Sequence, residues 1–300
     1  MLRPRSRWGC ALIEKEPSRT ALAAAAHRAA HQVLEQGAIF ADPLAVPIIG
    51  DHAQAATEMA RARPETRGMR LFIAMRSNVA ETALGAGVED RGVRQLVVLG
   101  AGLDTFAYRN PFADRLKVFE VDHPATQAWK RRRLAEAGVA LPASLVFTPV
   151  DFEREGLLDR LTDAGFDPAQ RTFFTWLGVV PYLTKPAISA TLALVAGVAG
   201  GAEVVFDYSD PPASLDPETH ASHQSRAAHV AALGEPFLSY FEPEVLHAEL
   251  ADLGFDHVDD LGPRGLLARH FPSAPAASRS DRGGHVLFAA TRSTTVRWRS

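Results

Sequence analysis

The chain has 300 residues, a formal net charge of −3 at pH 7 and a single cysteine, Cys10. Its length allows one large α/β domain or two small ones, and its near-neutral charge argues against a nucleic-acid partner. One cysteine excludes an internal disulfide framework and a cysteine-rich zinc site, and no apolar run approaches the ~20 residues of a membrane span. We therefore expect a cytoplasmic protein with no nucleic-acid partner and no membrane partner.

The first ninety residues are expected to form a helical cover that precedes the sheet. The alanine-rich stretch 17–36 predicts a helix that Ser18 or Thr20 caps and that Gly37 ends. Residues 40–44 are typical of a turn, and a second, shorter helix is expected after them.

A longer amphipathic helix is expected over residues 69–84. Its apolar stripe consists of Leu71, Phe72, Met75, Val79 and Ala83. Arg76 falls inside this stripe. A guanidinium among core positions must find an anion or carbonyl oxygens, unless its side chain passes the edge of the stripe and reaches solvent. The sequence leaves both interpretations of Arg76 open.

From residue 95 onward, short apolar runs alternate with helical patterns, which predicts βαβ units and a mostly parallel sheet. Residues 263–283 are rich in Pro, Ser, Ala and Arg and predict a mobile loop, so the last two strands are expected to be an antiparallel pair. The fold class is thus a doubly wound α/β sheet, with a core at 91–300 and a substrate-binding insertion at about 211–240. Strands are expected at 95–99, 116–121, 144–150, 172–177, 203–206, 255–258 and 284–291.

A glycine loop, Gly100-Ala101-Gly102, follows the first strand directly. Such glycines let a ligand approach the backbone closely, as in nucleotide-binding folds. The third glycine of the dinucleotide fingerprint is replaced by Thr105, and Asn110-Pro111 ends the next helix early. The loop therefore predicts a nucleoside-bearing cofactor, but not obviously one with a pyrophosphate.

Two aspartates follow the next two strands, where ligands of open α/β sheets bind. Asp122 lies twenty-two residues after Gly100, a spacing that suits a contact with ribose hydroxyls. Asp151, followed by Phe152, could offer a carboxylate to an adenine amino group and a ring to the base. Either aspartate could instead cap the helix that follows it. One ligand with an amino acid, a ribose and an adenine would fit all three strand ends.

Five motifs together resemble the leucine carboxyl methyltransferase family, whose members are class I S-adenosylmethionine-dependent methyltransferases. The resemblance covers about residues 17–210 and implies a Rossmann-like methyltransferase sheet of seven strands with an antiparallel last strand. It also implies S-adenosylmethionine as the cofactor. The motifs are Pro17–Ala21 (PSRTA), Phe40–Ala45 (FADPLA), Val98–Arg109 (VLGAGLDTFAYR), Phe119–Pro124 (FEVDHP) and Trp176–Thr184 (WLGVVPYLT).

Carried over by position, the resemblance assigns four residues to the methionine and ribose parts of the cofactor. Arg76 matches the arginine that binds the methionine carboxylate, which would explain its place in the apolar stripe. Gly100 and Gly102 match the residues that line the methionine part. Asp122 matches the acid on the ribose hydroxyls.

The remaining cofactor-binding residues implied by the resemblance are Asp151 and Phe152 for adenine, and Arg19 in a segment that closes over the cofactor. Two positions depart from many members of the family: Phe106 stands where arginine is common, and Leu177 where glutamate is common. Losing that glutamate removes one partner for the methionine amino group, so backbone carbonyls at Gly100 or Leu177 would have to serve.

The resemblance implies methyl transfer to an oxygen of a small molecule, a carboxylate or a hydroxyl. A carboxylate is already ionised and needs no base, whereas a hydroxyl acceptor could need one within hydrogen-bond reach. We expect Tyr182, Tyr208 and Asp207 on the acceptor side.

Two basic patterns lie on predicted helices. His220 and His223 are three residues apart and are further candidates for the acceptor side. No third metal ligand is evident, so no metal is expected, and both are expected to face solvent rather than to form a metal site. The basic run at 130–133 is expected to be a solvated helix face.

Two alternatives stay open. One is a cofactor-binding protein of the same fold without methyltransferase activity, and the other is an NAD-dependent oxidoreductase. The acceptor and the oligomeric state do not follow from the sequence.

Overall fold

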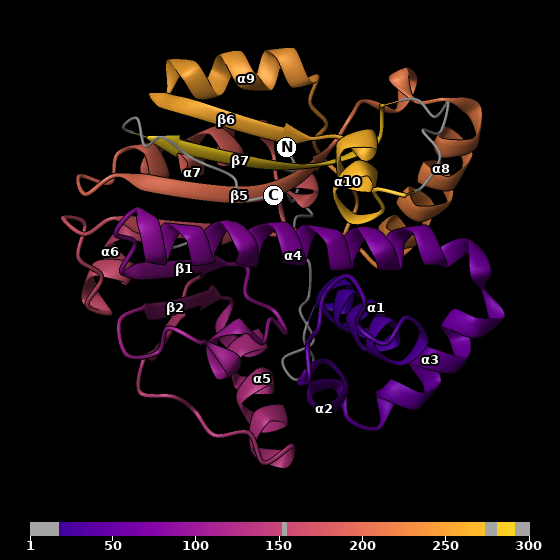
Figure 1. The fold of residues 1–300 in the computed structure, drawn as a ribbon, viewed down its shortest axis with the longest axis horizontal. Helices are drawn as coiled ribbons and strands as arrows, with labels where there is room; N and C mark the ends of the chain where they lie inside the picture. Colours follow the sequence, from indigo (N-terminus) through magenta and orange to yellow (C-terminus); the bar gives the residue numbers. More distant parts are fainter. Residues whose placement is uncertain (1–17, 152–154, 274–280, 292–300) are drawn as a thin grey trace, which may run out of the picture.

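The structure, a computed structural model, describes residues 18–151, 155–273 and 281–291. A seven-stranded sheet in the order β3-β2-β1-β4-β5-β7-β6 forms its centre (Figure 1). Neighbouring strands are parallel except around β7, which is antiparallel to both β5 and β6. The expected fold class is confirmed. The strands are β1 (Gln95–Leu99), β2 (Lys117–Asp122), β3 (Leu145–Pro149), β4 (Thr172–Trp176), β5 (Ala202–Ser209), β6 (Phe255–Leu261) and β7 (Gly284–Thr291).

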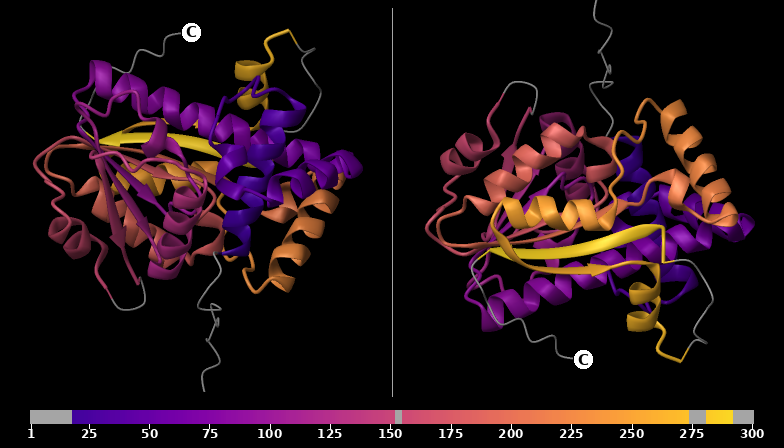
Figure 2. Two further views of the ribbon diagram at one scale, coloured as in Figure 1. Left: turned by 90° about the horizontal axis from the view of Figure 1, so that it is seen from below. Right: turned by 90° about the horizontal axis from the view of Figure 1, so that it is seen from above.

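Helices cover both faces of the sheet (Figure 2). α4, α5 and α10 pack on one face, and α6, α7 and α9 pack on the other. None of the helices in the described ranges is both long enough and apolar enough to span a bilayer. The helices are α1 (Arg19–Leu34), α2 (Ala45–Ile49), α3 (His52–Ala62), α4 (Arg67–Asp90), α5 (Pro124–Glu136), α6 (Leu157–Asp163), α7 (Lys185–Ala196), α8 (Pro217–Ala232), α9 (Pro243–Asp252) and α10 (Pro263–His270).

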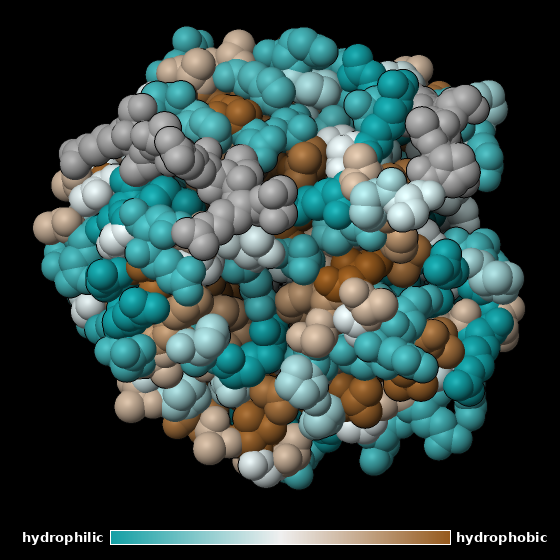
Figure 3. Space-filling view, viewed as in Figure 1, coloured by the Kyte–Doolittle hydropathy of each residue, from teal (hydrophilic) through white to brown (hydrophobic). Residues whose placement is uncertain are grey.

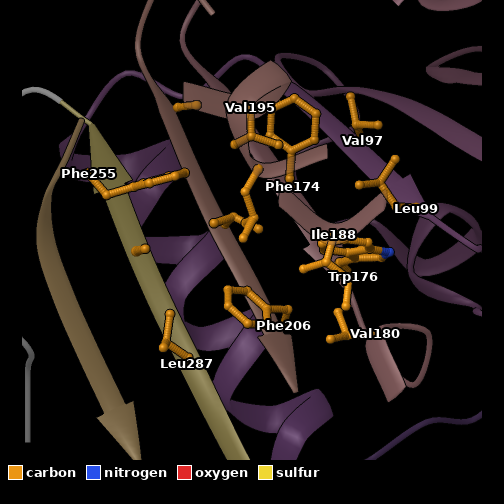
Figure 4. Packing of buried hydrophobic residues seen from close by; sticks show 14 of the residues in the cluster. Val97, Leu99, Phe174, Trp176, Val180, Ile188, Val195, Phe206, Phe255 and Leu287 are labelled. Atoms are coloured by element: carbon orange, nitrogen blue, oxygen red, sulfur yellow. The ribbon is translucent and has the colours of Figure 1, made fainter. Parts of the chain in front are cut away.

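The central strands are buried on both faces, which explains why their sequences are continuous apolar runs. Successive side chains of β1 point to opposite faces. Val97 and Leu99 pack with Trp176 against α7 (Figure 4). Leu96 and Val98 pack against α4 on the other side. The strand ends are thereby fixed between two helical layers.

Helices α1 to α3 pack beside the N-terminal half of α4 (Figure 1). Ala25 and Ala29 are fully buried, and their small side chains let α1 lie close to Ile48 and Ile49 of α2. On the face drawn in Figure 3, apolar side chains are interspersed with hydrophilic ones.

Two expectations about the chain are wrong. Residues 263–283 were expected to lack regular structure, but the first eight form α10, because Leu266 is buried against the core that α4 covers; residues 274–280 lie outside the described ranges. The basic run at 130–133 is not a uniformly solvated face. Lys130 is buried, and its Nζ lies 2.7 Å from Glu120 Oε2, so the charge is paired inside the protein.

Candidate functional site

The candidate site lies at the carboxyl ends of β1 and β4, where the strand order reverses. Gly100 has a φ of +64°, and a Cβ on it would lie 2.5 Å from Val179 Cγ2. Gly178 has a φ of +72°, and a Cβ there would lie 2.7 Å from Arg76 Nη2. Only glycine suits such positions. The loops after β1 and β4 therefore meet each other and the middle of α4.

Arg76 reaches this point from α4 and is only 9% exposed. Its Nη1 donates to Asp207 Oδ2 at 2.9 Å, and Asp207 Oδ1 accepts the Gly178 N–H at 2.6 Å. Arg76 Nε is buried with no hydrogen-bond partner among the described residues. The interpretation of Arg76 as a side chain that reaches solvent is therefore wrong. A buried guanidinium with a spare donor is suited to bind a carboxylate.

Asp122 ends β2 beside the glycine loop. Its Oδ2 accepts the Gly102 N–H at 2.5 Å and its Oδ1 accepts the His123 N–H at 2.7 Å. Burial raises the pKa of the Asp122 carboxyl, although these two N–H groups act in the opposite direction. The N-cap of α5 is His123, whose Nδ1 accepts the Ala125 N–H at 3.2 Å. The interpretation of Asp122 as the N-cap of α5 is therefore wrong, and its carboxylate instead ties the end of β2 to the glycine loop.

Asp151 lies close to Asp122, because the preceding Val150 N–H donates to the Asp122 carbonyl at 3.0 Å. It does not cap α6, whose N-cap is Gly156. Phe152 lies outside the described residues.

The start of α1 also reaches the glycine loop. A Cβ on Gly102 would lie 3.2 Å from Ala21 Cβ. Arg19, the first residue of α1, is exposed.

The side chain of Leu177 packs against the core that α4 covers. Its backbone carbonyl is therefore the only polar group that Leu177 can offer to the amino group of a ligand. The part of the chain that the structure describes thus holds a buried arginine, a glycine loop and two carboxylates along one sheet edge. This arrangement fits the methionine, ribose and adenine parts of S-adenosylmethionine.

Residues 21–196 match the family model of the leucine carboxyl methyltransferases. The chain belongs to this family. It is 38% identical over 174 residues to the Bacillus subtilis protein named "Putative S-adenosyl-L-methionine-dependent methyltransferase YktD", and the match spans 57% of the length of each protein. A Mycolicibacterium smegmatis protein named "Putative S-adenosyl-L-methionine-dependent methyltransferase" is 28% identical over 294 residues, 93% of this chain and 89% of that protein. These names agree with S-adenosylmethionine as the cofactor of the family.

Two solved structures resemble this fold. A "putative methyltransferase" from Thermobifida fusca superposes with a TM-score of 0.57 at 15% identity, over 96% of this chain and all of that chain. A DUF574 family protein from Streptomyces avermitilis superposes with a TM-score of 0.55 at 14% identity, over 93% of this chain and all of that chain. At such identities the likeness concerns the fold alone.

The three residues expected on the acceptor side of this family member differ in their surroundings. Tyr182 is half-buried in the short 3-10 turn η3 (Val180–Tyr182) directly after β4. Asp207 is engaged by Arg76 and Gly178, so it orients the arginine. Tyr208 is buried, its hydroxyl donates to Asp260 Oδ2 at 2.5 Å, and its ring stacks on His285. Asp207 and Tyr208 are neighbours on β5 and point to opposite faces, which places Tyr208 away from Arg76.

A buried polar cluster beneath the glycine loop was not predicted from the sequence. Asp42 is 1% exposed and accepts a hydrogen bond from Thr105 Oγ1 at 2.8 Å. Arg28 and Arg109 approach the same carboxylate at 3.4 Å and 3.5 Å. Arg28 also donates to the Leu103 carbonyl. The cluster fixes the glycine loop against α1. Its only signal was that Asp42, Thr105 and Arg109 lie within motifs shared with the family.

Glu235 is a second residue that the sequence did not single out. Its Oε2 accepts hydrogen bonds from the hydroxyls of Ser18, at 3.2 Å, and of Thr20. The residues that follow are tied to η3: the Leu238 N–H donates to the Pro181 carbonyl at 2.7 Å. Ser239 Oγ donates to the Val180 carbonyl at 3.0 Å. The segment after α8 therefore bridges the start of α1 and the end of β4.

Replacing Asp122 by alanine is expected to weaken the binding of S-adenosylhomocysteine by about tenfold or more, since a hydrogen bond to a charged group contributes about 1.5–3 kcal/mol. Isothermal titration calorimetry measures this change. Asp252→Ala, at an exposed position on α9, is the matched control and should bind like the wild type. Equal affinity of the Asp122 variant would remove this residue from the site.

Proposed function

We propose that the protein transfers a methyl group from S-adenosylmethionine to an oxygen of a small-molecule acceptor. The observation that carries the proposal is the buried Arg76, held by Asp207 beside Gly178, with Nε unpartnered among the described residues. A dinucleotide would require phosphate-binding N–H groups at a long helix here. The chain instead has the four-residue turn η2 (Phe106–Arg109) after the loop, and a guanidinium suited to an amino-acid carboxylate.

In the proposed reaction this chain binds the cofactor and the acceptor, orients them and excludes water. Arg76 would hold the methionine carboxylate, Asp122 the ribose hydroxyls and Asp151 the adenine. When bound, S-adenosylmethionine would supply a methyl group on a sulfonium: the new oxygen–carbon bond would form as the carbon–sulfur bond breaks, and S-adenosylhomocysteine would be the leaving group. A carboxylate acceptor has no proton to lose, and the proton of a hydroxyl acceptor would pass to solvent. Fixing both reactants in line provides much of the rate enhancement, because it replaces a bimolecular encounter by a bound geometry.

The elements around the strand ends would cover the cofactor and bind the acceptor. We propose that residues 1–90 cover the cofactor, that residues 91–300 form the catalytic core and that the insertion at 211–240 contacts the acceptor. Tyr182 contacts this insertion, because its ring and that of Phe237 have centroids 5.3 Å apart. Burial raises the pKa of Tyr182 to about 12, so its hydroxyl stays protonated at neutral pH and can donate a hydrogen bond to the acceptor.

Thermal unfolding with added ligands tests the cofactor. S-adenosylhomocysteine at one hundred times its Kd is expected to raise the unfolding midpoint by about 5 °C, because a ligand that binds only the folded state stabilises it by about 2.7 kcal/mol. NAD is expected to have no effect. Stabilisation by NAD alone would replace the proposal by an oxidoreductase.

Transfer itself is tested with methyl-labelled S-adenosylmethionine and panels of carboxylic acids, phenols and amines. Label in a carboxylate or hydroxyl product is the expected result, and alkali separates the two, because it releases methanol from an ester and not from an ether. Label only in amines would overturn the oxygen acceptor. Binding without transfer to any panel would favour a cofactor-binding protein that is not a methyltransferase.

A further inference from the structure

Helix α8 has an unusual inner face. A surface helix normally turns apolar residues toward the protein. On α8 the less exposed positions include His220, His223 and Arg226 beside Thr219, Ala227 and Val230. The exposed positions between them include Ser222, Gln224, Ser225 and His229. The expectation that both His220 and His223 face solvent is wrong for His223, which is 4% exposed. The inner face of α8 is therefore polar and basic.

Rings surround this face on the side of η3. The rings of His223 and Phe237 stack with centroids 5.7 Å apart, and Phe237 in turn contacts Tyr182. His223 Nε2 lies 3.0 Å from the Tyr240 hydroxyl. Tyr182, Phe237 and Tyr240 each remain partly exposed, so their rings can still contact another planar group. These rings connect the end of β4, beside Arg76, to the inner face of α8.

Arg226 is the charged group on this face. Its Nη1 donates to Ser222 Oγ at 3.1 Å, one turn earlier, in an exposed hydrogen bond, so the guanidinium lies at the solvent edge of this face. Within the described ranges no carboxylate forms an ion pair with Arg226, whereas Arg70, Arg76, Arg91 and Arg109 each have one. Arg226 is partly buried, and this burial lowers the pKa of its guanidinium, because a charge that leaves water without a counter-ion is disfavoured. An anionic ligand would offset this cost, and a guanidinium binds such groups through paired hydrogen bonds.

We infer that the inner face of α8 recognises the methyl acceptor, and that the acceptor is a small aromatic molecule with an anionic group that Arg226 binds. The inference rests on the proposed function and specifies its substrate class. The ring of the acceptor packs against Phe237 and Tyr182, which places it beside the end of β4. Neutral His223 and the Tyr240 hydroxyl complete the polar surroundings of Arg226.

The test uses the three positional isomers of hydroxybenzoate, each paired with the uncharged hydroxybenzamide of the same shape. Binding to the full chain is measured by calorimetry with saturating S-adenosylhomocysteine. At least one acid is expected to bind about tenfold more tightly than its amide, because the amide leaves the guanidinium without its anion. The preference is expected to vanish in Arg226→Gln and to be reduced in Arg226→Lys, which keeps the charge but not the planar fork.

Arg61→Gln, at an exposed position on α3, is the matched control and should keep the wild-type preference. Equal binding of acids and amides, a preference that survives in Arg226→Gln, or no binding of any acid would each overturn the inference. Failure of the proposed function would give a different result, because that function requires S-adenosylhomocysteine to bind. The affinity for S-adenosylhomocysteine should be the same in wild type and in Arg226→Gln.

Discussion

Replacing Arg76 by methionine is expected to lower the free energy of unfolding by about 3–5 kcal/mol, because it leaves the buried Asp207 carboxylate without its ion-pair partner. Methionine preserves the apolar contacts of α4, so the change isolates the charge. Binding of S-adenosylhomocysteine is expected to fall below detection, since its carboxylate loses the guanidinium. Urea unfolding measures the first effect, and titration calorimetry measures the second.

The double variant Arg76→Met/Asp207→Asn separates folding from binding. It removes both charges, and the asparagine Oδ1 can still accept the Gly178 N–H that Asp207 accepts at 2.6 Å. Most of the lost stability should return, because replacing both members of a buried ion pair by uncharged groups costs far less than removing one. The cofactor should still not bind. Normal binding by the double variant would exclude Arg76 as the carboxylate ligand.

Most of the fold could be predicted from the sequence, because the pattern of each element agrees with its final environment. β1 and β7 have the expected bounds, since each is a short buried run between turn residues. Arg76 stood out because a charged residue within an apolar stripe conflicts with the pattern around it. The sequence could not show which residue pairs with Arg76, because its partner Asp207 is 131 residues away.

The features that the sequence could not predict are contacts between segments that lie far apart in the chain. Asp42 binds Thr105 across 63 residues, and Glu235 binds Thr20 across 215 residues; nothing local to either acid indicates its partner. Tyr208 and Asp207 are both candidates for the acceptor side, and strand alternation places their side chains on opposite faces of the sheet. Which of the two side chains faces α4 could not be read from composition. Leu266 similarly anchors α10 in a segment whose composition predicts a loop.

The two faces of β5 each end in a buried charged network. On one face Asp207 holds Arg76. On the other, Tyr208 donates to Asp260, and Asp260 and Asp210 bind the two ring nitrogens of His285 at 3.0 Å each. His285 thereby joins the ends of β5, β6 and β7. This second network lies on the face of β5 opposite to Arg76, and it ties the strands at this side of the sheet together.

The charge on His285 makes stability depend on pH. Burial alone would lower the pKa of His285, but the hydrogen bonds and charges of Asp210 and Asp260 raise it from 6.5 to about 9. Because the folded pKa is higher than the unfolded one, this contribution is complete below pH 6.5 and is lost as the pH rises through about 9. The free energy of unfolding should fall by about 3 kcal/mol over this window. Urea unfolding at successive pH values between 7 and 9.5 measures the change.

His285→Gln is the decisive variant, because glutamine keeps a hydrogen-bonding side chain and carries no titratable charge. It should be less stable than wild type by about 3 kcal/mol at pH 7, and its stability should be nearly constant up to pH 9.5. His52→Gln, at an exposed position on α3, should retain the wild-type slope. Histidines whose pKa burial lowers, such as His27 and His223, titrate below pH 6.5 and cannot produce this slope. A wild-type slope in His285→Gln would therefore mean that His285 is neutral in the folded protein and that the two aspartates are held by Arg282, Tyr208 and His247 instead.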